Sequence, residues 1–394
     1  MPYHFAHLNI SKISVIGAGQ IGPDIALHFS KSLIHKDVKV MVVDISQQAL
    51  DQAKARTYKK IDKDAEKAVI TALEAEKIKA SLLYSTDYEH VKGSQLVVEA
   101  ATEDENIKDK IFRQVELLTD DTCIYLSNSS HMQPEVIFRN VKIQSRCLVA
   151  HYFFPADRNP VVEIVPSAAS DINTTLELVM FYKAMGKMPI IVKSSYGYAI
   201  DPIFEGLCQI AVLCLENGMG DEKQIDKVAR ETLGLGVGPF TALNLTGGNP
   251  ITAHGLDEMG KKLMPWFKTP KLLHEAVANK TNWNTAARDE QVEVSEDLRT
   301  QLHQEFLGGY FALCSFIMDC DISNINDLDT ACKVSLVIKA PFTFMNEMGM
   351  EKAFEYVKQF CEKHKTFALP KSIALACEAG QWNMGQAEGQ NSKT

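Results

Sequence analysis

The stretch that decides the fold is "ISVIGAGQIGPDIALHF", residues 13–29. It reads as a short apolar strand, a turn with Gly17, Gly19 and Gly22 in the pattern G-x-G-x-x-G, and the start of a helix. In such a turn the first glycine permits the tight bend, the second lets backbone approach a pyrophosphate, and the third allows close helix–strand packing. The helix N-terminus adds partial positive charge for phosphates. Pro23 fits, because a first helical turn tolerates proline. We therefore predict a dinucleotide site here.

The end of the next strand-like run supports this prediction. The run "VMVVD" closes on Asp44, 22 positions after Gly22. A carboxylate at this place can accept hydrogen bonds from the adenosine ribose hydroxyls, and it would repel a 2′-phosphate. The pattern therefore predicts NAD rather than NADP. The structural alternative is a glycine turn followed by an aspartate that only caps a strand end.

Strand-like and helix-like runs alternate through the first half of the chain. Apolar runs of buried-strand length occupy 38–44, 94–100, 122–128, 146–153, 161–166 and 188–194. Helical patterns separate several of them, at 107–119 and 174–186 among others. This alternation predicts an α/β fold with a mostly parallel, doubly wound sheet of Rossmann type. After about Lys193 the strand-like runs stop, and the chain reads as helices joined by short Gly/Pro turns.

The helical half contains an internal repeat. "QIDKVARETLGLGVGPFTALNLTG" (224–247) resembles "DLDTACKVSLVIKAPFTFMNEMG" (327–349), each running from an apolar–Asp step through a helix to a Pro-Phe-Thr corner. Two unrelated helices that share a Pro-Phe pair are the alternative. We predict an all-α C-terminal part made of two related units, with domains at 1–193, 194–300 and 301–394. The charged stretch 287–301 is the expected linker, and the tail 385–394 is expected to fray.

Composition narrows the class of protein. The net charge of -9 argues against nucleic acid or an anionic membrane as the main partner. No apolar run approaches the roughly 18 residues of a membrane span, and the N-terminus lacks a secretory signal pattern. The 9 cysteines are scattered without a CxxC pair, which is typical of reduced thiols in the cytoplasm. We predict no metal site.

The stretch "HYFFPADRNPVVEIVP", residues 151–166, places Glu163 inside an apolar run. A buried carboxylate costs several kcal/mol unless its charge is paired. Oxidation of a secondary alcohol needs a group that takes the hydroxyl proton, and a histidine with a pKa of about 6.5 can do this at neutral pH. A carboxylate on the other ring nitrogen would fix the tautomer and stabilise the imidazolium. We therefore predict that His151 and Glu163 pair across a turn-connected pair of strands. A structural strand-end histidine and an outward-facing glutamate are the alternatives.

With these segments the chain resembles the L-3-hydroxyacyl-CoA dehydrogenases of fatty-acid β-oxidation. "VVEAATEDENIKDKIF" (97–112), "SNSS" (127–130), "MGKMPIIVKSSYGY" (185–198) and "GVGPF" (236–240) also carry the resemblance. It implies that His151 is the catalytic base and that Glu163 orients it. It further implies that Ser130 and Asn128 contact the substrate, although Ser129 and Ser130 could instead cap the helix that follows. The implied NAD contacts are Gly17, Gly19, Gln20, Ile21, Gly22, Asp44, Ala101, Glu103 and Lys108.

The resemblance also implies an activity: reversible NAD-dependent oxidation of an L-3-hydroxyacyl-CoA to the 3-oxoacyl-CoA. The doubled helical unit is similar to the dehydrogenase part of multifunctional β-oxidation proteins. A second unit of this kind could take the place of a dimer partner, and a homo-oligomer is compatible with it.

Three positions depart from the family pattern. Phe154 stands where an asparagine follows the base, and Asn244 stands where an aspartate is usual. Asp201, followed by Pro202, replaces a substrate-contacting asparagine; a carboxylate accepts hydrogen bonds but donates none unless protonated. We retain Asp201 as a predicted substrate contact. Two alternatives stay open: a dehydrogenase of a non-CoA hydroxy acid, and a weakly active regulatory member that binds NAD or acyl-CoA.

Overall fold

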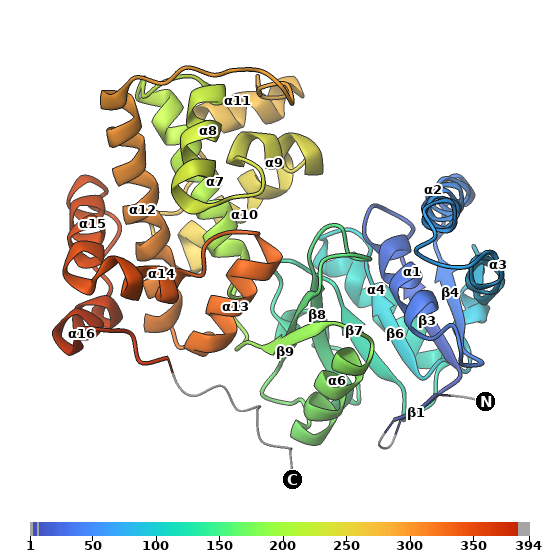
Figure 1. Ribbon diagram of the computed structural model, residues 1–394. Helices are drawn as coiled ribbons and strands as arrows, with labels where there is room; N and C mark the ends of the chain where they lie inside the picture. Colours follow the sequence, from blue (N-terminus) through green and yellow to red (C-terminus); the bar gives the residue numbers. More distant parts are fainter. Residues whose placement is uncertain (1–2, 6–7, 385–394) are drawn as a thin grey trace, which may run out of the picture. The chain divides into compact units, whose positions relative to one another are not determined.

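The computed structural model describes residues 3–5 and 8–384 (Figure 1). The chain divides into two compact units, Met1–Ser194 and Ser195–Thr394. The predicted fraying of the tail 385–394 lies outside the described residues.

An eight-stranded sheet forms the centre of the first unit. Its strands lie in the order β10-β9-β8-β7-β6-β3-β4-β5, and every neighbouring pair is parallel except β8 and β9. The strands are β3 (Lys12–Ile16), β4 (Lys39–Val43), β5 (Leu82–Ser85), β6 (Leu96–Glu99), β7 (Ile124–Ser127), β8 (Cys147–Tyr152), β9 (Val161–Pro166) and β10 (Met188–Ile191). A separate hairpin joins β1 (Tyr3–Phe5) to β2 (Leu8–Ile10). The predicted doubly wound fold is confirmed, and its switch point lies between β3 and β6, where α/β sheets bind ligands. The short strands β1, β2 and β5 were not predicted.

The first unit has six α-helices in its described part: α1 (Gly22–Ser32), α2 (Gln47–Glu66), α3 (Ala72–Ser81), α4 (Glu105–Leu118), α5 (Pro134–Ile137) and α6 (Ile172–Ala184). Side chains at their N-caps explain where several begin. Ser46 accepts a hydrogen bond from the backbone of α2, Asp104 from that of α4, and Asp171 from that of α6. Each of these caps satisfies backbone N–H groups that have no partner within the helix.

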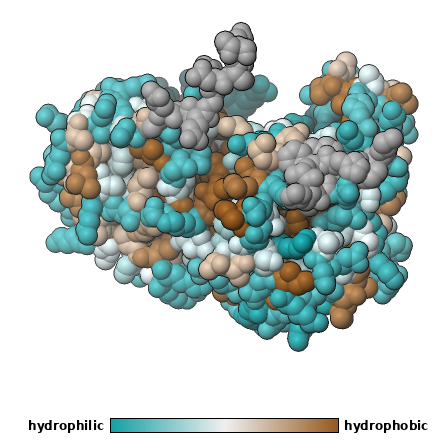
Figure 2. All heavy atoms as spheres, turned by 90° about the horizontal axis from the view of Figure 1, so that it is seen from below, coloured by the Kyte–Doolittle hydropathy of each residue, from teal (hydrophilic) through white to brown (hydrophobic). Residues whose placement is uncertain are grey.

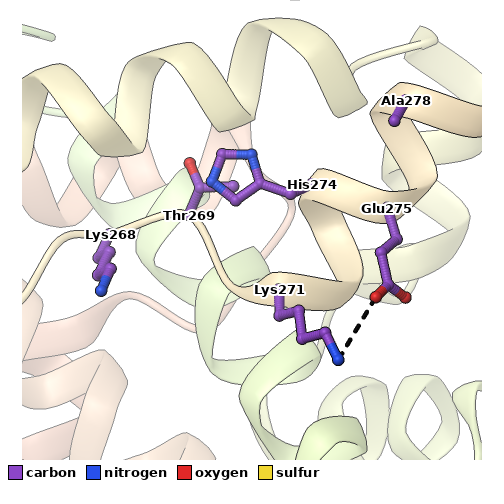
Figure 3. Close-up of a pocket in the computed structure, with 6 residues that line it drawn as sticks. All are labelled: Lys268, Thr269, Lys271, His274, Glu275 and Ala278. Carbon is purple, nitrogen blue, oxygen red and sulfur yellow. Dashed lines mark ion pairs between the residues drawn. The ribbon is translucent and has the colours of Figure 1, made fainter.

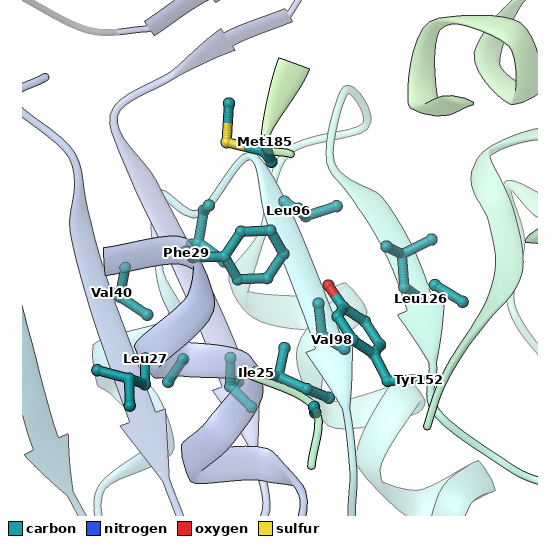
Figure 4. Close-up of a cluster of buried hydrophobic side chains, with 14 of the residues drawn as sticks. Ile25, Leu27, Phe29, Val40, Leu96, Val98, Leu126, Tyr152 and Met185 are labelled. Carbon is teal, nitrogen blue, oxygen red and sulfur yellow. The ribbon is translucent and has the colours of Figure 1, made fainter. Parts of the chain in front are cut away.

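The core of this unit anchors the strand that carries His151. Apolar side chains from α1, the sheet and the start of the α6–β10 turn meet in one buried cluster (Figure 4). Phe29 stacks on Phe181 with ring centroids 6.1 Å apart. Tyr152, the residue after His151, is buried here, and its hydroxyl donates to that of Tyr182 at 3.0 Å. The main chain next to the predicted base is therefore fixed by core packing.

The described part of the second unit consists of helices joined by loops and contains no strand. Its helices are α7 (Asp201–Glu216), α8 (Glu222–Leu233), α9 (Pro239–Thr246), α10 (Asn249–Lys262), α11 (Lys271–Asn279), α12 (Glu296–Asp319), α13 (Ile325–Ser335), α14 (Pro341–Met348), α15 (Met350–Lys363) and α16 (Lys371–Ala379). The series α7 to α11 and α12 to α16 match in order. The non-helical stretch between Asn279 and Glu296 separates them.

The predicted repeat has the same hydrogen bonds in both copies. Asp226 on α8 accepts from the backbone N–H of Phe240 at 2.8 Å, where α9 begins. Asp329 on α13 accepts from the backbone N–H of Phe342 at 2.7 Å, where α14 begins. In each copy the threonine that follows the phenylalanine donates its hydroxyl to the same carboxylate, at 2.6 Å. In each copy, therefore, the aspartate of the apolar–Asp step caps the helix that begins at the Pro-Phe-Thr corner.

The first helices of the two series pack through equivalent glycines. A Cβ atom at Gly206 would lie 2.7 Å from Leu313, and one at Gly309 would lie 2.2 Å from Ile210. Both glycines and both partners are related by the same step, since 309 − 206 and 313 − 210 each equal 103. Such reciprocal contacts are typical of a two-fold interface. They support the proposed division into two related units. The helix bounds place that division before Glu296, because the boundary expected between residues 300 and 301 lies inside α12.

No helix in the described residues is both long and apolar enough to cross a membrane. Hydrophilic side chains cover much of the face drawn in Figure 2, with apolar ones in smaller patches.

Candidate active site

The glycine turn connects β3 to α1 with the geometry that the motif predicts. Gly17 has a φ of +111°, and a Cβ there would lie 2.4 Å from the carbonyl oxygen of Ala100. A Cβ at Gly22 would lie 2.0 Å from the carbonyl oxygen of Gly17. Around Gly19, by contrast, no described atom lies within 4 Å of the equivalent position. Two of the glycines are thus required by the fold itself, whereas Gly19 leaves the backbone open to a phosphate group.

Asp44 follows β4 and reaches the glycine turn. One carboxylate oxygen accepts from the backbone N–H of Ala18 at 2.7 Å, and the other accepts from that of Ser46 at 2.8 Å. Arg56 on α2 donates to the carbonyl oxygen of Gly19 at 2.7 Å. Gln20 and Ile21 lie on the same turn and are at least partly exposed. The predicted nucleotide residues of this turn therefore converge, and Arg56 is an unpredicted contact among them.

The predicted base and its carboxylate face each other across the antiparallel pair β8–β9. His151 and Glu163 are direct partners in the register of the two strands. The imidazole Nδ1 of His151 is 2.8 Å from Oε2 of Glu163. Glu163 is fully buried and His151 is 3% exposed. The predicted contact is present, and it accounts for the charge in the apolar run "VVEIV", because a buried carboxylate needs such a partner.

Neighbouring side chains fix the position of this pair. The ring of Phe153 meets that of His151 edge-on, with centroids 4.5 Å apart. The backbone N–H of Tyr152 donates to Oδ1 of Asn128 at 2.9 Å. Since Oδ1 is used in this way, the amide N–H groups of Asn128 form the end that can donate to a substrate oxygen. Phe154 is 48% exposed, and its hydrocarbon side chain supplies no polar group beside the base.

The loop after β7 is organised by Glu103. One oxygen of this carboxylate accepts from the backbone N–H of Ser130 at 2.8 Å, and the other accepts from the hydroxyl of Ser129 at 2.9 Å. The helix that follows, α5, begins after Gln133 and has no side-chain cap. The alternative in which Ser129 and Ser130 cap that helix is therefore wrong. A predicted cofactor residue and a predicted substrate residue lie in direct contact.

Sequence reasoning missed Glu99, the partner of Lys108. The ammonium group of Lys108 lies 2.8 and 2.9 Å from the two carboxylate oxygens of Glu99 and 3.6 Å from Glu103. Glu99 also accepts from the backbone N–H of Ala101 at 2.7 Å and from the hydroxyl of Ser127 at 2.5 Å. Lys108 is only 1% exposed, so it lies beneath the surface that a cofactor could contact. The signal that could have found Glu99 was present, because "VVEA" places a charge at the end of an apolar run, as "VVEIV" does.

Asp201 belongs to the second unit, where it is the first residue of α7 and is half-buried. The second unit also has an open pocket of about 490 Å³ at the start of α11 (Figure 3). Its lining residues are Lys268, Thr269, Lys271, His274, Glu275 and Ala278. None of the predicted site residues is among them. The substrate role of Asp201 stays a prediction.

The glycine turn, the strand-end carboxylate and the buried His–Glu pair define the first unit as the nucleotide-binding domain of a dehydrogenase. Residues 12–195 match the family model described as the 3-hydroxyacyl-CoA dehydrogenase NAD-binding domain. Residues 12–195 therefore belong to the family of 3-hydroxyacyl-CoA dehydrogenase NAD-binding domains, and NAD is the cofactor of this domain.

Curated relatives extend the likeness beyond that domain. The chain is 31% identical over 274 residues to the fatty acid oxidation complex subunit alpha of Shewanella amazonensis, a match that covers 68% of this chain and 37% of the relative. It is 29% identical over 238 residues to the glyoxysomal fatty acid β-oxidation multifunctional protein MFP-a of Brassica napus, covering 60% of this chain and 32% of the relative. The chain therefore spans about a third of the length of these relatives.

Solved structures share the fold. A 3-hydroxybutyryl-CoA dehydrogenase from Escherichia coli K12 superposes with a TM-score of 0.82 over 95% of this chain and 99% of that one, at 17% identity. At this identity the likeness concerns the fold alone. A diketoreductase, from a study of dicarbonyl compounds, is 28% identical with a TM-score of 0.55, covering 61% of this chain and 86% of the other.

Proposed function

We propose that the protein is an NAD-dependent 3-hydroxyacyl-CoA dehydrogenase that interconverts an L-3-hydroxyacyl-CoA and the 3-oxoacyl-CoA. The observation that carries this proposal is the buried contact between His151 and Glu163 in a chain whose first unit is an NAD-binding domain of that family. The residues around the glycine turn fit NAD, since Gly19 leaves the backbone open and the carboxylate of Asp44 stands at the end of β4. When bound, NAD supplies the hydride acceptor.

In this proposal His151 takes the proton of the substrate hydroxyl. Its Nδ1 faces Glu163, so Nε2 is the nitrogen that exchanges the proton with the substrate. Glu163 holds the ring in the tautomer with hydrogen on Nδ1 and stabilises the imidazolium that forms. Because both side chains are buried, the interaction between their charges is stronger than it would be in water. In the reverse direction the same imidazolium returns its proton to the carbonyl oxygen.

Three further residues are proposed to hold the substrate. The amide of Asn128 and the hydroxyl of Ser130 can donate to the oxygen that changes between hydroxyl and carbonyl. Glu103 fixes the main chain of Ser130, which supports this arrangement. Asp201 would accept from a hydroxyl of the substrate, since an ionised carboxylate cannot donate to a ketone.

A second candidate is a dehydrogenase of a hydroxy acid that carries no CoA. Two observations favour it: Asp201 changes the group offered to the substrate, and the diketoreductase relative is named for dicarbonyl compounds. A weakly active member that binds NAD or acyl-CoA for regulation is the third reading, and the intact His–Glu pair argues against it.

Turnover separates these candidates. The purified chain is mixed with NADH and acetoacetyl-CoA, longer 3-oxoacyl-CoAs, or CoA-free acetoacetate, and the NADH absorbance is followed. We expect oxidation of NADH with at least one acyl-CoA, little with acetoacetate, and loss of turnover in His151→Gln. Oxidation with acetoacetate alone would favour the second candidate, and no oxidation with any acyl-CoA would sink the first.

We also infer that the second helical series takes the place of a dimer partner, which the reciprocal contact of α7 and α12 supports. Sedimentation of the chain as a monomer is the expected result. A dimer formed between chains through α7 and α12 would contradict the inference, whereas an oligomer formed through another surface would not. A cytoplasmic location stays a prediction that cell fractionation can test.

A further inference from the structure

The loop between β8 and β9 joins the proposed base to its carboxylate partner, and it carries a buried charge of its own. Asp157 on this loop has no exposed side-chain surface. The ammonium group of Lys60, on α2, lies 3.0 Å from Oδ1 of Asp157. The same ammonium lies 2.7 Å from Oδ1 of Asp24, in the first turn of α1 and two positions after Gly22. Lys60 therefore connects the helix that follows the glycine turn to the loop that follows the base.

A second lysine holds the main chain of the same loop. Lys187, just before β10, is buried and donates to the carbonyl oxygens of Ala156 and Asn159, each at 2.6 Å. These carbonyls flank Asp157 on both sides. The loop is thus held at its side chain by Lys60 and at its main chain by Lys187.

The surroundings of Asp157 show why the positive charge of Lys60 is needed at this place. In the described residues the second carboxylate oxygen of Asp157 is buried without a hydrogen-bond partner, and Nε of Arg158 lies 3.7 Å from it. Without the Lys60 ammonium, Asp24 and Asp157 would be two neighbouring buried carboxylates, an arrangement in which one carboxylate tends to stay protonated. Burial raises the pKa of Asp24 above its usual value, although Lys60 opposes that rise. Burial alone would also raise the pKa of Asp157, but the hydrogen bond and charge of Lys60 leave it below its usual value.

We propose that Lys60 is a positioning residue for the reaction: by bridging Asp24 and Asp157 it holds the loop between His151 and Glu163 at a fixed place relative to the nucleotide turn. This inference rests on the proposed function. Lys60 touches neither His151 nor Glu163, so its effect on turnover passes through the loop. Hydride transfer is sensitive to misplacement of the reacting groups by about 1 Å, which is why a loop tether can matter to the rate.

The variant Lys60→Met removes the charge and keeps most of the side-chain volume. A matched control is Lys79→Met, because Lys79 on α3 also bridges two carboxylates, Asp62 at 2.7 Å and Glu76 at 3.2 Å. Those carboxylates are well exposed and lie on no loop of the site. We expect Lys60→Met to lower kcat about tenfold, while the KM for NADH changes by less than about threefold. Lys79→Met should match the unmodified chain, and Lys60→Arg should recover most of the lost kcat.

A pH series separates positioning from a general loss of stability. Other charged groups surround the cluster of Lys60, Asp24 and Asp157. Lys31 and Asp64 pair with each other at 2.6 Å, and Arg158 of the loop lies near Asp64. Lys187 and the buried His28 lie beside them. In Lys60→Met the repulsion between Asp24 and Asp157 is present when both are ionised and is relieved when one takes up a proton. The deficit in kcat should therefore be larger at pH 9 than at pH 6. Adding Asp157→Asn to Lys60→Met should reduce the deficit at pH 9, because the repulsion is removed.

A readout without turnover keeps this proposal separate from the proposed function. The ring-nitrogen resonances of His151 in histidine-labelled protein, assigned with His151→Gln, report the surroundings of the base directly. They should shift in Lys60→Met and stay in place in Lys79→Met. If no acyl-CoA is turned over by the unmodified chain, the proposed function fails while this shift still tests the tether. Unchanged His151 resonances, or a kcat of folded Lys60→Met within twofold of the unmodified chain from pH 6 to 9, would overturn the inference.

Discussion

Replacing Glu163 by glutamine tests how far the buried carboxylate contributes to turnover. The change keeps size and shape and removes one negative charge from a partner that lies 2.8 Å from the imidazole of His151. Glutamine can present its oxygen to Nδ1–H, or its amide N–H to an unprotonated Nδ1, so it no longer fixes one tautomer. The stabilisation of the imidazolium is also lost.

The expected size of the effect follows from the burial of the pair. Opposite charges about 4 Å apart attract by about 4 kcal/mol at an effective dielectric constant near 20, a value that suits buried sites. A dipole of glutamine recovers part of this, which leaves a loss of about 2–3 kcal/mol, or roughly 30- to 150-fold in kcat. The fold should survive, because the strand pairing of β8 and β9 does not depend on the charge.

The assay is steady-state oxidation of a 3-hydroxyacyl-CoA, with NADH affinity measured separately by fluorescence. Tyr152→Phe is the control, because it removes the hydroxyl contact with Tyr182 beside the base and changes no charge. Its kcat should stay near that of the unmodified chain. Turnover of Glu163→Gln within threefold of the unmodified chain would refute the assignment of Glu163 as the partner of the base.

The remaining predictions concern the nucleotide turn, one buried histidine and the repeat. Gly22→Ala should abolish NADH binding and lower stability, since its Cβ would lie 2.0 Å from a carbonyl oxygen. Gly19→Ala should fold normally and only weaken NADH binding. Melting curves with and without NADH distinguish these two results. Burial lowers the pKa of His28 from 6.5 to about 3, so the unfolded chain takes up a proton at a higher pH than the folded chain does. The free energy of unfolding should therefore fall as the pH falls from 6.5 toward 3. In urea titrations this loss should reach about 4–5 kcal/mol relative to the variant His28→Leu. Asp226→Ala and Asp329→Ala should each lower the free energy of unfolding by about 2–4 kcal/mol, because each leaves two backbone N–H groups at the start of a helix without an acceptor. A loss of stability in only one of these two variants would contradict equivalent roles of the two aspartates.

The features that the sequence predicts are those that depend on contacts between residues close together in the chain. The glycine turn was found because close approach of backbone to backbone admits no side chain at Gly17 or Gly22, and such a constraint shows in the sequence itself. The contact of His151 with Glu163 was found because a charge in an apolar run needs a partner and the two residues lie only 12 positions apart. Both inferences depend on neighbours along the chain.

Contacts between distant segments leave no such trace. Lys60 is 36 positions from Asp24 and 97 from Asp157, and no local pattern joins the three. In the sequence Lys60 is one of several cations on a polar helix, where a solvated face is the natural interpretation. The four residues of β5 form a strand mainly because β4 offers its edge to them, which neither length nor apolar pattern announces.

The asparagine at position 244 stands where an aspartate is usual in the family that the chain resembles, and the structure gives a reason for it. In the structure the amide of Asn244 accepts from the backbone N–H of Trp283 at 2.9 Å and donates to the carbonyl oxygen of the same residue at 2.9 Å. An ionised aspartate could accept but could not donate, so it would leave that carbonyl without its partner and place two negative ends together. Asn346 repeats both hydrogen bonds in the second series: it accepts from the backbone N–H of Trp382 at 2.7 Å and donates to the carbonyl oxygen of Trp382 at 3.1 Å. The asparagine is therefore explained by its two hydrogen bonds to the main chain of a tryptophan, which both helical series share. These hydrogen bonds account for Asn244 without a role in substrate recognition.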